Sequence, residues 1–369
     1  MTILGLLRFR SIGKTACNKN DPNQEPNWNP GVIRTDVLIS LLHPDASAQP
    51  AAPRVPIEPP MKIFVSCFLL STAVWAQDPI QVHGYIQGRF TNQEGVPDRL
   101  EIRRARLTVL GDASSQLSYT AQVDVVKKPY LLDASLMWKP AGAVHVTIGQ
   151  LKIPFSTESL LADNLEVPIE RARVVNSLAP GRDTGVQARD VGLQVSGILE
   201  RRNRPWIEYA AGIFRGQPLI YSPPAHFRAT AARVMLHPIQ GLALGADWYG
   251  SISVSGGPVK RRSEAEGSYK WNSLTLQVEQ IWARDGKLEH SGGYALSGWR
   301  FDKLWEGMTR AEWIRSNTSK PNTGSFIYEA GVNYYYGKHV KVQADIGART
   351  DQSPPRTTGV FLAQMQLSF

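Results

Sequence analysis

Apolar and polar residues alternate along most of the chain from residue 77 onward, which indicates a succession of β-strands. Residues 340–349 show the pattern clearly, because valine, alanine and isoleucine alternate with lysine, glutamine, aspartate, glycine and arginine. The pattern predicts about 16 strands, with no room for helices between them, at residues 80–90, 100–111, 116–126, 131–139, 143–151, 186–199, 206–215, 228–236, 242–254, 262–271, 274–283, 293–301, 308–316, 326–336, 340–349 and 359–369.

Short and long connections alternate between these strands. Residues 111–115 and 337–339 are short connections, whereas we expect longer loops at 316–325 and 350–358. Short turns on one rim and long loops on the other are typical of outer-membrane β-barrels.

The two faces of each predicted strand suit different surroundings. One face is apolar and the other suits water, as in a barrel that faces lipid and encloses a wet lumen, or in a soluble sheet packed on a core. Strand length favours the barrel, and so do tryptophans and tyrosines near strand ends, although ordinary core aromatics are the alternative. On this interpretation Val123, Leu276, Val342 and Leu367 contact lipid, and Gln122, Gln343 and Gln364 contact water. The aromatic residues are Trp138, Trp271, Trp282, Trp299, Trp313, Tyr119, Tyr328, Tyr334 and Tyr336.

The last residues repeat the alternation and end on an aromatic side chain. Phe361, Ala363, Met365, Leu367 and Phe369 form one apolar row. This row is similar to the C-terminal signal by which bacterial outer-membrane barrels are handed to their insertion machinery. We therefore expect an all-β, multi-pass barrel in the outer membrane of a Gram-negative type of cell.

A secretory signal peptide is expected at residues 61–76. Met61 and Lys62 precede an apolar run at 63–74, and a small-residue cleavage site ends at Ala76. Residues 1–60 are rich in proline, asparagine and aspartate, and we interpret them as disordered or as untranslated sequence before a start at Met61. The barrel domain then spans residues 77–369.

Charge and composition narrow the possible functions. Residues 1–76 contain seven of the 41 basic and five of the 32 acidic residues, which leaves 34 against 27 in the rest. A moderate positive surplus attracts anions, but no Lys/Arg run with interleaved aromatics indicates nucleic acid. The mean hydropathy of −0.24 is uninformative, because only alternate residues of a barrel strand face lipid.

The chain shows no recognisable catalytic or metal-binding motif. Its two cysteines, Cys17 and Cys67, lie before residue 77, and HExxH, Walker, nucleophile-elbow and CxxC patterns are missing from the sequence. We therefore expect neither an enzyme nor a cofactor or metal site.

A long segment without strand alternation, residues 153–182, interrupts the series after the fifth predicted strand. Such a segment in a strand-rich domain is functional or disordered. Residues 149–156, GQLKIPFS, and 179–183, APGRD, flank it and resemble two runs of the phosphate-selective porin O and P family. Residues 103–109, RRARLTV, resemble a hairpin of the same family.

This resemblance implies a porin whose third loop folds into the barrel and narrows the pore. It implies passive uptake of small anions such as phosphate or polyphosphate, and a homotrimer. The exit of the loop is ambiguous by six residues, because GRDTGVQ and ARDVGLQ are near-copies that compete for the start of the next strand.

The candidate anion path consists of bases and hydroxyls that are expected to face the lumen. Strand parity selects the first group and the long loop supplies the second, and guanidinium groups suit phosphate oxygens. Acids on the same wall and in the loop leave open a general diffusion porin with mixed charges, and a non-conducting structural barrel or adhesin is a further alternative. The candidates are Arg89, Arg104, Arg106, Lys341 and Arg349, with Lys152, Ser156, Thr157, Arg171, Arg173 and Arg182.

The signal-peptide assignment predicts that the mature protein begins at Gln77 and is found in the outer membrane. N-terminal sequencing and peptide mapping of the native protein from fractionated membranes measure this directly. Recovery of peptides from before Met61 would show that the extension is translated and retained.

Overall fold

The computed structural model describes residues 80–216, 228–252 and 258–369. The predicted signal peptide at 61–76, the extension at 1–60 and residues 77–79 of the expected barrel domain lie outside the described residues.

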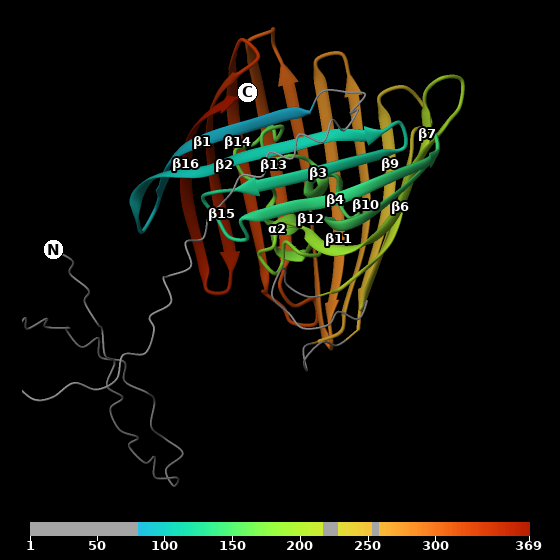
Figure 1. Ribbon diagram of the computed structural model, residues 1–369. Coiled ribbons are helices and arrows are strands. Elements are labelled where there is room, and N and C mark those ends of the chain that lie inside the picture. Colours follow the sequence, from blue (N-terminus) through green and yellow to red (C-terminus); the bar gives the residue numbers. More distant parts are fainter. Residues whose placement is uncertain (1–79, 217–227, 253–257) are drawn as a thin grey trace, which may run out of the picture. The chain divides into compact units, whose positions relative to one another are not determined.

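Sixteen antiparallel strands in the described part of the chain close into one barrel, each paired with its neighbours in sequence. This confirms the predicted fold class (Figure 1). The strands are β1 (Gln81–Gln93), β2 (Val96–Ser114), β3 (Leu117–Asp124), β4 (Leu131–Ala141), β5 (Val144–Lys152), β6 (Arg189–Glu200), β7 (Pro205–Phe214), β8 (Ala229–Leu236), β9 (Leu242–Ser251), β10 (Lys260–Trp271), β11 (Leu274–Asp285), β12 (Leu288–Arg300), β13 (Trp305–Arg315), β14 (Gly324–Tyr336), β15 (Val340–Gln352) and β16 (Pro355–Ser368).

The first and last strands close the barrel. β1 pairs with β16 from Tyr85 opposite Ser368 to Gln93 opposite Val360. The terminal residue completes the seam, since Phe369 N donates to Gly84 O and Gly84 N donates to Phe369 O, both at 2.9 Å. Closure leaves no strand edge open to pair with another chain.

The outer face of the barrel is apolar and the inner face is polar. Leu276, Val342 and Leu367 are exposed on the outside, as predicted, and so are Trp138, Trp271, Trp282, Trp299 and Trp313. The expectation of open water around Gln343 and Gln364 is wrong. Both are buried, because Gln364 Nε2 donates to Gln343 Oε1 at 3.0 Å and Gln343 Nε2 donates to the backbone oxygen of Val167 at 3.1 Å.

Two other expectations need correction. The expected long loop at 350–358 is only the connection 353–354, because β15 and β16 continue to pair as far as Gln352 opposite Pro355. The ambiguous loop exit is also resolved, since β6 begins at Arg189 in the second of the two near-copies.

The helices in the described part of the chain, α1 (Thr157–Leu160) and α2 (Arg173–Leu178), are short. Neither is long and apolar enough to span a membrane.

Because the outer face of β4 is apolar and its inner face is polar, a charge introduced at neighbouring residues should lower the free energy of unfolding by different amounts. Leu136 is 51% exposed on the apolar face, whereas Ser135 shares the inward parity of Asp133, which pairs with Arg189. Leu136→Arg should cost about 2 to 4 kcal/mol of unfolding free energy near the middle of a bilayer, and Ser135→Arg about 1 kcal/mol or less. Denaturant unfolding in lipid vesicles measures both values, and equal costs would contradict the assignment of the faces.

Candidate functional site

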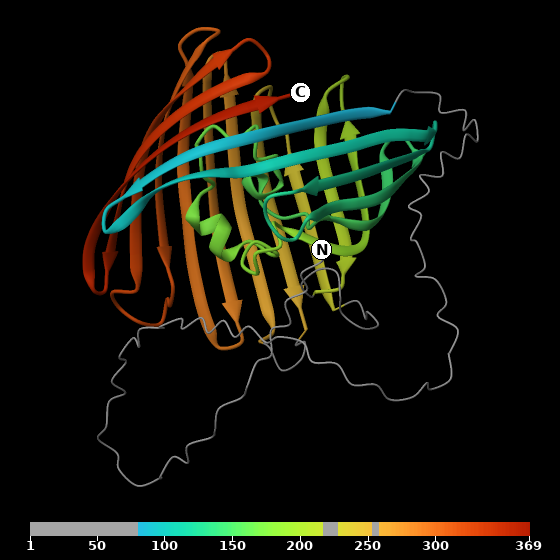
Figure 2. The ribbon, with the colours of Figure 1, turned by 60° about the vertical axis from the view of Figure 1, so that its left-hand side comes forward.

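The segment between β5 and β6, residues 153–188, folds into the barrel and contains both helices. Figure 2 shows it inside the barrel, and α2 contacts β11, β12 and β13. We call residues 153–188 the inner loop. Apolar packing holds the inner loop against the barrel wall. One cluster contains loop residues Ile153, Phe155, Val174, Val175 and Leu178 together with wall residues Phe214, Tyr249, Ile281 and Tyr294.

Two glycines of the sequence motifs allow the chain to enter and leave the lumen. A Cβ at Gly149 would lie 2.2 Å from the backbone oxygen of Ala134 on β4, where its φ is +127°. Gly181 has a φ of +74°, and a Cβ there would lie 3.0 Å from the backbone of Ala188 and Arg189. Glycine is required at both positions because a side chain meets backbone atoms that have no room to move.

Acidic wall residues hold the start of the inner loop by accepting its backbone N–H groups. Ser156 N donates to Asp247 Oδ2 at 2.6 Å, and Thr157 N donates to Glu266 Oε2 at 2.9 Å. Glu279 accepts from Ser156 Oγ at 2.6 Å and from Glu158 N at 2.8 Å. These acids therefore replace the secondary-structure partners that the loop backbone lacks.

The second half of the inner loop is held in the same way. Ile169 N donates to Asp345 Oδ2 at 2.6 Å, and Arg173 N, at the start of α2, donates to Glu312 Oε2 at 2.6 Å. Strands on a large part of the barrel wall, from β9 to β15, thus bind one loop.

Wall arginines bind the acids of the inner loop. Asp163 pairs with Arg104 at 3.1 Å, with Arg171 at 2.6 Å and with Arg106. Burial opposes ionisation of Asp163, but Arg171, Arg104 and Arg106 lower its pKa well below the ordinary value. The charged carboxylate of Asp163 thus joins two arginines of the wall, on β2, to Arg171 of the loop itself.

Glu170 forms a second pairing centre, with Arg89 and with Arg103 at 3.0 Å. Burial raises its pKa, but Arg89 and Arg103 outweigh burial and lower it to about 2. Its contribution to stability is therefore present above the ordinary glutamate pKa of about 4.3 and is lost as the pH falls toward 2.

Several predicted path residues have structural partners instead of a free charge. Lys152 ends β5 and donates to the backbone oxygens of Leu160 at 2.7 Å and Leu161 at 3.0 Å. Arg182 donates to the backbone oxygen of Ser159 at 2.6 Å, and Lys341 donates to that of Glu166. Arg171 lies buried between Asp163 and Glu166, and the Thr157 hydroxyl accepts from Arg233 at 2.6 Å.

A cavity of about 370 Å³ lies between the inner loop and the wall formed by β1, β2 and β13–β16. Four predicted residues, Arg89, Arg171, Arg173 and Arg349, line it. Arg104, Arg106, Lys152, Ser156, Thr157, Arg182 and Lys341 do not. The described charged residues that line this cavity are Arg89, Arg99, Arg171, Arg173, Arg310, Arg349, Glu170, Glu312 and Glu329.

Arg173 and Arg349 also line a larger cavity of about 980 Å³ near the connections 316–323 and 353–354. Arg173 is exposed on α2, and no ion-pair partner lies within reach of it among the residues that the structure describes. Partial burial and the neighbouring Arg349 lower the pKa of Arg173. Both guanidinium groups line both cavities and repel each other, and an anion between them would relieve the repulsion.

Sequence analysis did not identify Arg99 and Arg310, which line the smaller cavity of about 370 Å³. Arg310 shares the inward parity of Glu306, Met308 and Glu312 on β13, so parity was a signal that could have found it. It pairs with Glu329 at 2.5 Å and with Glu312 at 3.3 Å.

A closed antiparallel barrel with an apolar outside, a polar inside and a loop folded into its lumen is the architecture of the porin class. Residues 80–198 match the phosphate-selective porin O and P family, which confirms the expected resemblance over this part of the chain. The family match and the fold together support an outer-membrane porin channel and point to a channel rather than an enzyme.

Solved porins share the fold at low sequence identity. An anion-selective porin from Comamonas acidovorans is 10% identical, with a TM-score of 0.61 over 79% of this chain and 99% of its own. OmpF of Salmonella typhi, in complex with daunomycin, is 11% identical with a TM-score of 0.61 over 79% and 97%. The trimer form of OmpT, an outer-membrane protein of Vibrio cholerae, is 12% identical with a TM-score of 0.58 over 79% and 99%. No curated protein matches the chain.

The contacts of Asp163 predict a large effect of neutralising it. Asp163→Asn should cost about 3 to 5 kcal/mol of unfolding free energy, because three buried guanidinium groups share this counter-charge. Arg106 and Arg171 would keep Asp124 and Glu166, whereas Arg104 would lose the ion-pair partner found for it among the described residues. Denaturant unfolding and limited proteolysis measure the effect, with earlier cleavage expected inside the inner loop. Asp112→Asn is the control, since the pair of Asp112 with Lys139 is about one-third exposed and should contribute about 1 kcal/mol or less. Equal costs for the two variants would contradict this role of Asp163.

Proposed function

We propose that the protein is an outer-membrane porin whose water-filled channel favours small anions, with phosphate or polyphosphate as the expected class. The observation that carries the proposal is the charge of the cavity beside the inner loop. Six arginines and three glutamates line it among the described residues.

The acids near this cavity are engaged by other groups of the protein. Glu170 is paired with Arg89 and Arg103, and Glu329 is paired with Arg310. Glu312 accepts from the backbone of α2. Arg173 and Arg349 therefore present the positive charge that a passing solute meets, although Arg349 is partly compensated by Asp351 at 2.7 Å.

The inner loop strengthens this charge by narrowing the space around it. A charge acts more strongly between low-dielectric walls than in bulk water, and guanidinium groups offer paired donors to phosphate oxygens. In the proposed path an anion enters the larger cavity, where Lys320 and Arg356 also lie, and passes between Arg173 and Arg349.

The two alternatives make different demands on the molecule. A general diffusion porin requires acids that face the path without a partner. Asp285 and Asp351 line the larger cavity but pair with Arg262 and Arg349, and the row formed by Asp247, Glu266 and Glu279 binds the backbone of the inner loop. A non-conducting barrel requires no lined path, whereas the two cavities share Arg173 and Arg349. The first contrast supports an anion channel, and the second supports a conducting barrel.

The other parts of the proposal concern maturation and assembly. Residues 61–76 direct export, residues 77–369 form the barrel, and the C-terminal strand is handed to the insertion machinery of a Gram-negative outer membrane. A homotrimer is proposed as well, and its support is the family resemblance together with the trimer form of a protein that shares the fold.

Replacing Arg173 and Arg349 together by glutamine should reduce anion preference. The zero-current potential across a planar bilayer under a salt gradient should move toward the cation side, and phosphate should block chloride current less. Both effects follow because the double variant removes two positive charges that line both cavities. The readouts are the zero-current potential and the phosphate concentration that halves the chloride current.

Arg284→Gln is the matched control, because Arg284 pairs with Glu289 on an exposed surface and does not line either of these cavities. It should leave both readouts at their wild-type values. Wild-type selectivity in the double variant would instead support a general diffusion porin.

A further inference from the structure

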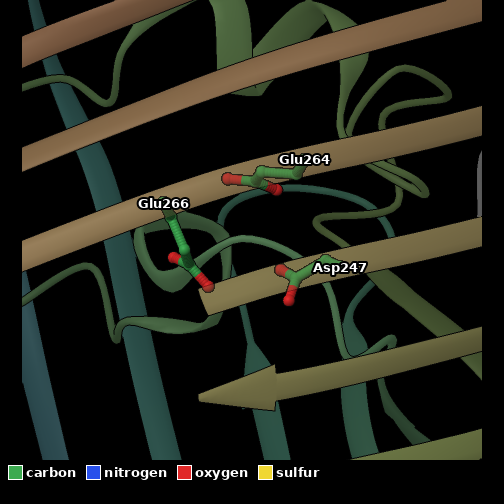
Figure 3. A group of neighbouring side chains, drawn as sticks. All are labelled: Asp247, Glu264 and Glu266. Carbon is green, nitrogen blue, oxygen red and sulfur yellow. The ribbon is translucent and has the colours of Figure 1, made fainter. Parts of the chain in front are cut away.

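Three carboxylates converge on the inner wall where β9 and β10 run side by side. Figure 3 shows Asp247 on β9 with Glu264 and Glu266 on β10. All three are buried, and a carboxylate oxygen from each lies within 4.8 Å of the others. β10 is eight strands from β2 in the closed barrel, so this cluster lies across the lumen from Arg99 and Arg103.

The strand register forces like charges together. Asp247 is directly opposite Glu264 in the pairing of β9 with β10, and Glu266 is directly opposite Glu279 in the pairing of β10 with β11. Directly opposed like charges destabilise a sheet. Two such pairs that share one strand therefore require a compensating positive charge.

Among the residues that the structure describes, one cationic side chain forms ion pairs with the cluster, and it does not contact all three carboxylates. Arg233 pairs with Asp247 Oδ2 at 2.7 Å and with Glu266 Oε1, and it also donates to the Thr157 hydroxyl at 2.6 Å. No ion pair of Glu264 is found in the parts of the chain that the structure describes. Four wall carboxylates thus face a single guanidinium group.

Glu264 carries the strongest indication that a ligand is missing. Its side chain is only 3% exposed, and within the described residues neither of its carboxylate oxygens has a hydrogen-bond partner. Asp247 Oδ1 also lacks a hydrogen-bond donor there, whereas Glu266 Oε1 is in ion-pair contact with Arg233. The partnered oxygens, Asp247 Oδ2 and Glu266 Oε2, accept the backbone N–H groups of Ser156 and Thr157. A buried carboxylate without a partner is costly, so the free oxygens indicate a cation.

The spacing suits calcium. Ca²⁺ takes six to eight oxygen ligands at roughly 2.3 to 2.6 Å, so two of its ligand oxygens lie at most about 5 Å apart. Two free oxygens of Glu264 and one of Asp247 are available as ligands, and Glu266 Oε1, which also contacts Arg233, is a fourth. One carboxylate oxygen from each of the three residues meets the distance limit, with water as the source of the other ligands.

We propose that Asp247, Glu264 and Glu266 bind one divalent cation, with Ca²⁺ as the preferred ion, and that this ion stabilises the wall to which the inner loop is anchored. The site is separate from the proposed anion path. Its ligands hold the first turn of α1, so loss of the ion loosens the anchor through the same carboxylates that bind Ser156 and Thr157.

Equilibrium dialysis with radioactive Ca²⁺ tests the site directly. The full chain, refolded in detergent without lipopolysaccharide so that no lipid phosphate binds calcium, should bind one Ca²⁺ per chain and release it to a chelator. Calcium should also raise the thermal transition temperature, because a ligand that binds the folded state stabilises it. Absence of binding by the folded wild-type protein would overturn the proposal and would indicate that protons neutralise the cluster.

Glu264→Gln should abolish both the bound calcium and the calcium-dependent rise in transition temperature. It removes one of two opposed charges, so folding should be retained, and circular dichroism checks this. Glu312→Gln is the matched control, since Glu312 is a buried wall acid that also binds the inner loop but lies outside the cluster, and it should still bind one Ca²⁺. Asp247→Asn provides a second measurement of the same loss. Undiminished binding in both cluster variants would place the calcium elsewhere and reject the site.

Discussion

The backbone of the inner loop imposes the main constraint on this structure. A segment inside a barrel has no neighbouring strand, yet its N–H and C=O groups must still find partners. The wall supplies carboxylates to the N–H groups of Ser156, Thr157 and Ile169, and Asn333, Gln343 and Arg262 donate to the loop carbonyls. Much of the charge on the inner wall is consequently committed to holding the loop and is not available to solutes.

This commitment separates the arginines into two groups. Arg89, Arg104 and Arg106 are bound to acids of the loop, so their charges are locally compensated. Arg173 and Arg349 lie where two cavities meet and retain exposure. A count of bases in the sequence does not separate the two groups, and the proposed anion preference depends on the exposed group.

The sequence was sufficient to predict the strands, because a period of two is a local signal, and it placed the apolar face on the outside. It did not predict the connection at 353–354, since continued pairing of β15 with β16 depends on both strands and not on either alone. Roles within the lumen were harder to predict. Lys152 and Arg182 were expected in the path, but their partners are loop carbonyls whose positions depend on the folded loop. Arg310 could have been found from the inward parity of β13, but its contacts with Glu170 and Glu329 could not be predicted, because these residues are distant in sequence.

The seam between β1 and β16 has a consequence for biogenesis. The backbone N–H and C=O of Gly84 both form hydrogen bonds with Phe369, so the first and last strands pair although nearly the whole barrel domain separates them in sequence. Contacts between residues so far apart in sequence carry the largest loop-closure entropy and form slowly. The barrel is therefore unable to close until β16 is available to pair with β1. Until that pairing forms, both strands present open edges that other chains can bind.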